Sequence, residues 1–308
     1  MGPYLPAAAL AGFALYRLYR RSSDRPAGGS TEVGAFWRFT APRAVASVAQ
    51  LALQRLDIVL VAAMRGPAEA AVYTAATRFL VVGQLGSQAI SLAVKPHLGV
   101  HLAREDRAET NNLYRTATAW LILMTWPLYL LAVAFVPYLL GAGYAEGAAV
   151  VLVLCLPMLV ATGCGMVDVV LNMAGRTGWN LGNSLLALTV NVTLNLLLIP
   201  PLGILGAAIA WSVAILVNNL LPLAQIAWAL GLHPFGTATR TAAVLSFVSF
   251  GVLPGISRTI GVSTPWVLGL ATVLGGALFV WGCWRRRETL ALRSLRTLRS
   301  RRPTPEPA

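Results

Sequence analysis

Three ionisable side chains, Arg55, Asp57 and Arg78, lie inside two apolar segments that a short turn at Arg65-Gly66-Pro67 joins. A charge at the centre of a bilayer costs about 2.5–3.5 kcal/mol on insertion scales, so such residues face a protein interior or a watery cavity and find partners there. We expect Asp57 to pair with Arg55 or, across the turn, with Arg78. Such a pair would either clip two helices together or take part in binding or coupling.

Amide side chains recur four residues apart inside other apolar segments, and residues at this spacing share one face of a helix. Polar stripes of this kind either join helices, at about 0.6 kcal/mol per hydrogen bond, or line a hydrated cavity. For the whole set we favour a polar lumen. Arg55, Arg78 and Lys95 would make this lumen positive, and Asp57 and Asp168 would partly offset that positive charge. The stripes are Gln50 and Gln54, Gln84 and Gln88, Asp168 and Asn172, Asn191 and Asn195, and the neighbours Asn218 and Asn219.

The composition indicates a membrane protein, because 57% of the 308 residues are hydrophobic, 11% are charged, and the mean hydropathy is +0.68. Apolar runs of the roughly 20 residues that cross a bilayer recur along the chain. We therefore predict an all-α polytopic membrane protein of about nine spans. The predicted spans are Pro3–Tyr19, Phe36–Met64, Ala70–Lys95, Tyr114–Leu140, Ala148–Met173, Trp179–Ile199, Ile204–Leu230, Thr237–Leu253 and Pro265–Trp284.

Breaker residues and polar stretches divide the chain into parts. The largest polar loop is expected at Leu102–Asn112, which contains the charged sequence REDRAET. The predicted parts are a first or partial helix (1–19), a cytoplasmic linker (20–34), a six-helix transporter lobe (35–231), two additional membrane helices (232–284) and a basic cytoplasmic tail (285–308).

The basic residues predict the orientation of the chain. The net charge is +13, and most of the 24 basic residues fall in alternate loops and in the tail, which is the topology signal of membrane proteins rather than a nucleic-acid footprint. We predict a multi-pass protein of the bacterial plasma membrane with a cytoplasmic C-terminus. The tail either lies as a basic amphipathic helix on the anionic leaflet or serves only as a topology signal.

The sequence gives no positive sign of an enzyme. The three cysteines lie in apolar spans without a disulfide or metal-binding spacing. No nucleotide-binding loop, histidine cluster or Ser-His-Asp arrangement is evident, so no cofactor and no metal are expected.

Two stretches of the chain look familiar. The first is Arg55-Leu56-Asp57 with the following Gly66-Pro67, Tyr73 and Arg78, and the second is NVTLNLLLIPPLGILGAAIAWSVA, preceded by Gly175-Arg176. Both resemble the polysaccharide flippases of the multidrug/oligosaccharidyl-lipid/polysaccharide exporter superfamily, which include O-antigen and teichoic-acid exporters. The resemblance extends from about Phe36 to Leu230 and covers the C-terminal part of such a protein.

The resemblance implies two six-helix lobes that enclose a central cavity and rock between inward and outward openings. The cavity is often cationic in sugar-lipid flippases, and Arg78, with Arg55 or Lys95, would bind the diphosphate head group here. Since the chain holds one lobe, a missing N-terminal lobe, a partner chain or a second copy would supply the other.

The leading hypothesis is outward movement of an undecaprenyl-diphosphate-linked oligosaccharide for surface polysaccharide synthesis, without ATP hydrolysis. One alternative is a cation-coupled multidrug exporter that uses Asp57 or Asp168, and another is a non-transporting membrane scaffold or remnant. A membrane glycosyltransferase fits less well, because the loops are short. The candidate substrate contacts are Arg78, Arg55, Lys95, Gln84, Gln88, Asn191, Asn195 and Asn218.

Overall fold

The computed structural model describes residues 30–140, 145–259 and 265–291, and over these ranges the chain is helical throughout apart from short turns. Two compact units divide the chain at Ala44, and the described part of the first is the beginning of helix α2. The helices are α2 (Ser30–Arg65), α3 (Pro67–Ala103), α4 (Arg107–Leu140), α5 (Ala145–Gly163), α6 (Val167–Met173), α7 (Thr177–Leu202), α8 (Ile204–Leu230), α9 (Thr237–Phe247), the π-helix η2 (Val248–Val252), α10 (Leu253–Thr259) and α11 (Pro265–Arg285).

Seven segments of the described chain are long and apolar enough to cross a membrane, which confirms the predicted all-α polytopic class. Helix α3 is not among them, since Gln84, Gln88 and Lys95 interrupt its apolar residues. The predicted span Pro3–Tyr19 lies outside the described residues. The seven segments are Ala44–Arg65, Arg107–Val136, Gly147–Met173, Thr177–Leu202, Ile204–Leu230, Thr237–Ile256 and Trp266–Arg285.

Several predicted boundaries differ from the structure. Helix α2 begins at Ser30, inside the predicted linker, and the polar loop predicted at Leu102–Asn112 is wrong, because α3 and α4 extend into it. The backbone N–H of Glu109 donates to Asp106 Oδ1 over 3.1 Å, so Asp106 satisfies one of the unpaired donors at the start of α4. The connector is therefore short: Arg104, Glu105 and Asp106 form the turn, and Arg107 and Glu109 lie in the first turn of α4.

The predicted span Ala148–Met173 is interrupted between α5 and α6. Gly165 has a φ of +77°, and a Cβ atom there would collide with the side chain of Thr118 on α4. The hydroxyl of Tyr114 donates to the Cys164 carbonyl over 2.5 Å, which satisfies a backbone acceptor freed by the break. Asp168 therefore lies on a separate short helix, α6, rather than on a continuation of α5.

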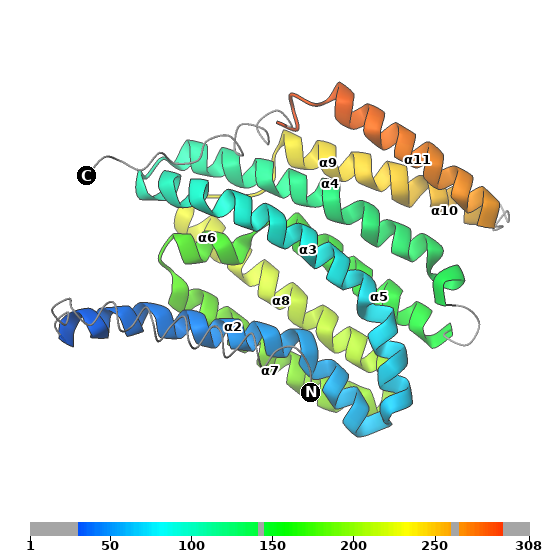
Figure 1. Ribbon diagram of the computed structural model, residues 1–308, viewed down its shortest axis with the longest axis horizontal. Helices are drawn as coiled ribbons and strands as arrows, with labels where there is room; N and C mark the ends of the chain where they lie inside the picture. The colour runs from blue at the N-terminus through cyan, green and yellow to red at the C-terminus, as the bar shows by residue number, and fades with distance from the viewer. Residues whose placement is uncertain (1–29, 141–144, 260–264, 292–308) are drawn as a thin grey trace, which may run out of the picture. The chain divides into compact units, whose positions relative to one another are not determined.

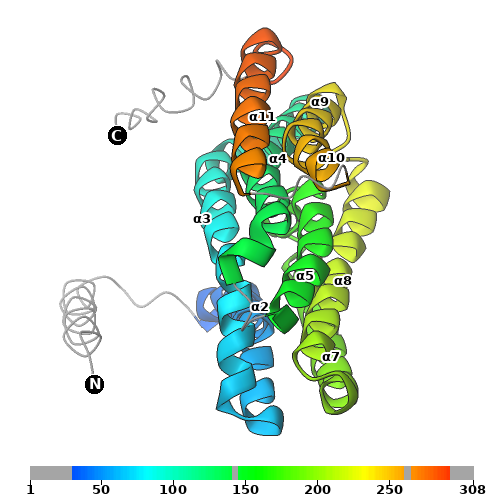
Figure 2. The ribbon, with the colours of Figure 1, turned by 90° about the vertical axis from the view of Figure 1, so that its right-hand side faces the viewer.

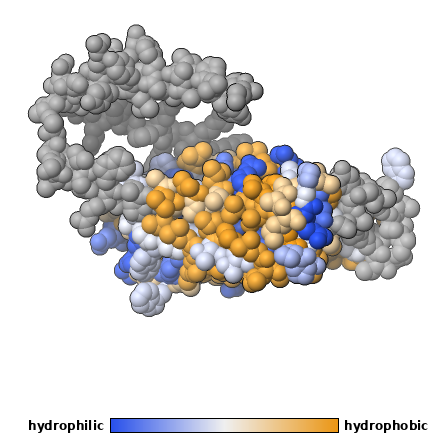
Figure 3. Space-filling model, turned by 90° about the horizontal axis from the view of Figure 1, so that it is seen from below, coloured by the Kyte–Doolittle hydropathy of each residue, from blue (hydrophilic) through white to orange (hydrophobic). Residues whose placement is uncertain are grey.

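Within the second unit, α4 runs between α3, α5 and α9, and α7 and α8 form an antiparallel pair (Figures 1 and 2). Buried side chains from α2, α3, α4, α5 and α8 meet in one apolar cluster, whose largest members are Tyr73, Tyr129 and Trp211. One face of the molecule is hydrophobic across its centre and hydrophilic toward its edges (Figure 3). That distribution suits a bilayer environment.

The turn between α7 and α8 depends on close backbone contact. A Cβ atom at Gly206 would overlap the backbone carbonyl of Leu198 across the turn. Rigid backbone cannot yield as the end of a flexible side chain can, so we expect Gly206→Ala to destabilise the protein by about 1–3 kcal/mol. Thermal unfolding of the purified protein in detergent measures this as a lower Tm.

Gly182→Ala on α7 is the matched control, because no atom lies within 4 Å of the Cβ position there. Alanine is the better helix former by about 1 kcal/mol, so this variant should unfold at the same temperature or higher. Equal Tm values for the two variants would contradict the role assigned to Gly206.

Candidate functional site

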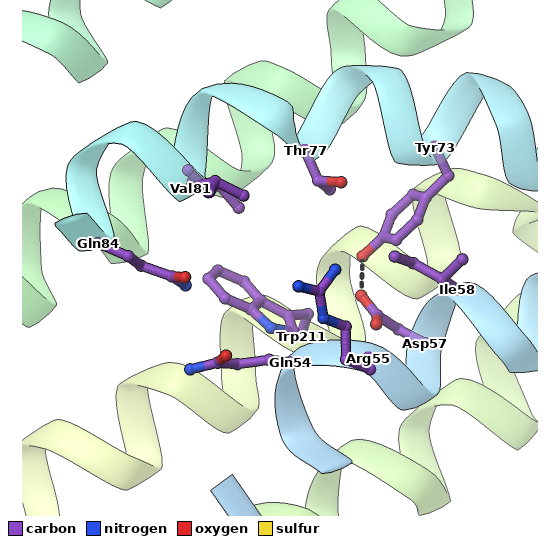
Figure 4. A pocket seen from close by; sticks show the side chains of 10 residues that line it. Gln54, Arg55, Asp57, Ile58, Tyr73, Thr77, Val81, Gln84 and Trp211 are labelled. Carbon is purple, nitrogen blue, oxygen red and sulfur yellow. Dashed lines mark hydrogen bonds between the residues drawn. The ribbon is translucent and has the colours of Figure 1, made fainter. Parts of the chain in front are cut away.

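A polar pocket lies between α2 and α3 and is closed at one side by Trp211 of α8 (Figure 4). About 460 Å³ of space free of protein atoms lies within it, open solvent included. We call it the α2–α3 pocket. Its lining residues are Gln54, Arg55, Asp57 and Ile58 from α2, Tyr73, Thr77, Leu80, Val81 and Gln84 from α3, and Trp211.

Asp57 and Tyr73 join the two helices at this pocket. The Tyr73 hydroxyl donates to Asp57 Oδ2 over 2.5 Å, and the two residues are 3% and 0% exposed. Asp57 Oδ1 is buried and has no hydrogen-bond partner. A buried carboxylate with one free oxygen can accept a further hydrogen bond or bind a cation.

The ion pair predicted for Asp57 is therefore wrong. In the described part of this hairpin, the salt bridge joins Arg65 Nε to Glu69 Oε1 over 3.1 Å, across the Gly66-Pro67 turn. Tyr73 faces Asp57 because both residues are equally distant from Arg65 in an antiparallel hairpin. Its hydroxyl takes the place that an arginine was expected to fill.

Arg55 lies beside Asp57 on the pocket wall, with its guanidinium directed into the space below Thr77 (Figure 4). The side chain is exposed, and no salt bridge or hydrogen bond holds the guanidinium within the described part of the chain. Arginine offers five N–H donors in a fork that fits carboxylate and phosphate oxygens. The pocket thus presents an available anion-binding group next to a buried carboxylate.

A second pocket adjoins the first, because both are lined by Gln54, Gln84 and Trp211. This amide pocket contains about 890 Å³ of space free of protein atoms, open solvent included, and extends past α4 and α5 to Asp168 on α6 and Asn218 on α8. Its remaining polar lining consists of Gln50, Ser87, Ser91, Thr162 and Asn219. Together the two pockets form one polar groove, which runs from Asp57 to Asp168.

The groove brings together Arg55, Asp57, Gln84, Asp168 and Asn218 among the residues predicted to form a site. The other three predicted residues of α3 do not line either pocket. Arg78, Gln88 and Lys95 are exposed on that helix.

Asn191 and Asn195 also lie away from the groove. They are completely buried, and Asn195 Nδ2 donates to the Asn191 carbonyl over 2.9 Å and to Asn191 Oδ1 over 3.1 Å. These bonds lie within α7, so this stripe neither lines the groove nor joins two helices through them. Asn183 and Gln225 do join two helices, since they pair between α7 and α8 with reciprocal hydrogen bonds of 2.7 and 2.9 Å.

Tyr73, Thr77 and Trp211 line the groove but are not among the residues predicted to form a site. The position of Tyr73 carried a usable signal, because a turn at Gly66-Pro67 places it opposite Asp57. Trp211 lies 154 residues from Asp57 in the sequence, so no local pattern connects the two. Helix packing alone brings that ring to the groove.

Removal of the Tyr73 hydroxyl tests the hydrogen bond to Asp57. In Tyr73→Phe neither oxygen of this buried carboxylate would have a partner, and an unsatisfied buried group costs about 1–3 kcal/mol, more when charged. We expect the loss to be smaller when Asp57→Asn is already present. Unfolding of the single and double variants in detergent gives the coupling free energy.

Tyr114→Phe combined with Asp57→Asn is the control pair, because Tyr114 bonds to Cys164 in a different buried cluster. Groups without shared partners give additive effects within about 0.5 kcal/mol. Additive behaviour of the Tyr73 and Asp57 variants would contradict the hydrogen bond.

The chain was compared with protein-family models, with curated proteins and with solved structures. The family model described as MatE matches residues 42–205, which is more than half of the chain and extends from within α2 to the start of α8. No curated protein and no solved structure matches.

Proposed function

Because the chain belongs to the MatE family, whose members are transporters of the multidrug/oligosaccharidyl-lipid/polysaccharide exporter superfamily, we propose that it moves a lipid-linked oligosaccharide across the bacterial plasma membrane. The substrate class is an undecaprenyl-diphosphate-linked glycan, and the movement follows alternating access without ATP hydrolysis. The polar groove binds the head group.

The observation that carries this proposal is the available guanidinium of Arg55 in a groove whose other polar lining consists of amides, hydroxyls and the carboxyls of Asp57 and Asp168, set among apolar side chains. A diphosphate needs a cationic donor, and arginine meets phosphate oxygens in a bidentate geometry. Sugar hydroxyls both donate and accept, as do the side chains of Gln54, Gln84 and Asn218. The groove therefore offers partners for both parts of a glycosyl diphosphate.

A second lobe is part of the same proposal. Carriers with internal repeats bind substrate between two repeats near the middle of the membrane. Exposed apolar residues of α2 and α3, among them Leu51, Val82 and Leu85, flank the groove and suit contact with such a lobe. A further segment of the protein, a partner chain or a second copy would supply it.

Cation-coupled drug export is the second candidate, and Asp57 favours it. The carboxylate is buried at the groove, and its Oδ1 atom has no hydrogen-bond partner. A proton or a sodium ion could occupy that oxygen. Asp168, at the other end of the groove, is a second acidic group for such coupling.

Arg55→Gln tests the leading candidate. It removes the charge and keeps a polar side chain, and a hydrogen bond to a charged group contributes about 1.5–3 kcal/mol. We expect export of the surface glycan to fall about 10–100-fold. Surface glycan is quantified in cells that express the variant in the complete transport system, at matched protein levels in the membrane.

Arg78→Gln is the matched control, because Arg78 is exposed on α3 and lines neither pocket. It should export glycan at the normal rate. Normal export by Arg55→Gln, or an equal loss in both variants, would contradict the role of Arg55.

The drug-export candidate predicts the opposite sensitivity. Asp57→Asn keeps the size of the side chain and can still accept a hydrogen bond from Tyr73, but it removes the acid that would bind a coupling cation. In proteoliposomes with an imposed proton or sodium gradient, drug uptake should disappear in Asp57→Asn and persist in Arg55→Gln. Glycan transport that survives Asp57→Asn but not Arg55→Gln would instead support flipping.

A further inference from the structure

A second groove lies outside the matched residues 42–205, between α9 with η2 on one side and α11 on the other. It holds about 1110 Å³ of open space. We call it the outer groove. Its lining residues are Arg240, Thr241, Val244, Leu245, Val248, Leu278, Trp281, Gly282, Arg285 and Arg286.

The outer groove is formed by two helical segments that contact each other at Gly275 and again at Gly282 of α11, where a Cβ atom would overlap the Leu245 side chain of α9. A Cβ atom at Gly275 would overlap the Ser249 carbonyl, so α11 and η2 are in backbone contact there. Phe250 and Phe279 pack edge to face at 5.3 Å near the Gly275 contact. Toward its C-terminal end α11 rises away from α9 (Figures 1 and 2), and this leaves a space between them.

Three arginines gather at the open end of the groove. Arg240 lies near the start of α9, and Arg285 and Arg286 lie at the end of α11. The guanidinium of Arg285 lies over the Trp281 ring at 5.2 Å. All three are exposed, and no carboxylate is among the residues that line the groove.

The turn after α11 holds these arginines in place. Leu290 is completely buried against Ala119, Ile122 and Ala242. Its carbonyl accepts a 2.9 Å hydrogen bond from Trp120 Nε1, and its N–H donates to the Arg286 carbonyl over 2.9 Å. The backbone that carries Arg286 is thus tied through Leu290 to α4 and α9.

The rest of the groove is apolar and partly exposed. Val244 is 63% exposed and Trp281 is 52% exposed, and Val248 and Leu278 lie further from the arginines. At 1.5 Å per residue, the apolar lining extends about 10–12 Å along the helices from the charged end. That length covers most of one leaflet of a hydrocarbon core about 30 Å thick.

We propose that the outer groove binds one anionic membrane phospholipid, with its phosphate on Arg240, Arg285 and Arg286 and an acyl chain along Val244, Val248 and Leu278. Charge complementarity selects this occupant, because basic pockets between membrane helices bind anionic head groups. The tryptophan lies where aromatic rings meet the head-group level. The lipid would fill the space between α9 and α11 and stabilise their packing.

Lipid titration of the purified chain in a neutral detergent tests the proposal, with phosphatidylglycerol and phosphatidylcholine as probes. Phosphatidylglycerol should raise the Tm and remain bound in native mass spectrometry, and phosphatidylcholine should do so at least tenfold more weakly. The variant R240Q/R285Q should lose this preference. The control R104Q/R107Q removes two exposed arginines elsewhere and should keep it. Equal binding of the two lipids, or an unchanged preference in R240Q/R285Q, would overturn the proposal.

A steric variant decides the matter if the arginine variant does not fold. Val244→Trp places a ring in the groove, whereas Val273→Trp on α11 changes a similarly exposed valine, 68% exposed, that does not line it. Only Val244→Trp should release phosphatidylglycerol. Undecaprenyl phosphate serves as the competing probe. If it displaces phosphatidylglycerol at a lower concentration than phosphatidylglycerol itself requires, the groove belongs to a polyprenyl lipid and the proposal fails.

Discussion

The hydrogen bond from Tyr73 to Asp57 is the constraint on which the arrangement of α2 and α3 depends. A carboxylate that is 3% exposed requires a partner, and the tyrosine supplies one from the facing helix. The Arg65–Glu69 salt bridge and the Gly66-Pro67 turn connect the two helices where α2 ends and α3 begins. One carboxylate oxygen of Asp57 is bonded to Tyr73 and holds the two helices together. The other oxygen has no partner and remains available at the groove to accept a hydrogen bond or bind a cation.

Polar residues inside the described helices fall into two groups that differ in their neighbours. Asn183 and Gln225 bond to each other and join α7 to α8, and Asn191 and Asn195 bond to each other within α7. The others line the polar groove, and these include Gln54, Gln84, Asp168 and Asn218. The presence of an amide in an apolar span therefore does not by itself predict the role of that side chain. The side chain opposite it decides between a structural bond and a binding surface.

Much of the fold was predictable from apolar length and breaker residues. Helix α8 has the predicted bounds, Ile204–Leu230, because Gly203 and Gly231 interrupt the helix at both ends with positive φ angles. The site was only partly predictable. Arg78 follows Thr77, yet one residue turns a helix by about 100°, so Thr77 lines the pocket and Arg78 does not. The rotation of α3 about its axis comes from packing, which a single sequence does not encode locally.

The arginines of the two grooves differ in the surroundings that set their chemistry. Arg55 lies beside a buried carboxylate and among amides, in a groove shared by helices of the matched family region. Arg240, Arg285 and Arg286 lie at the open end of an apolar groove formed by helices beyond that region. A polar surrounding suits a head group that must bind and leave, because competing donors keep the interaction weak. An apolar wall beneath a cluster of cations suits an amphipathic molecule that stays, because burial of its chain adds to the attraction of its charge.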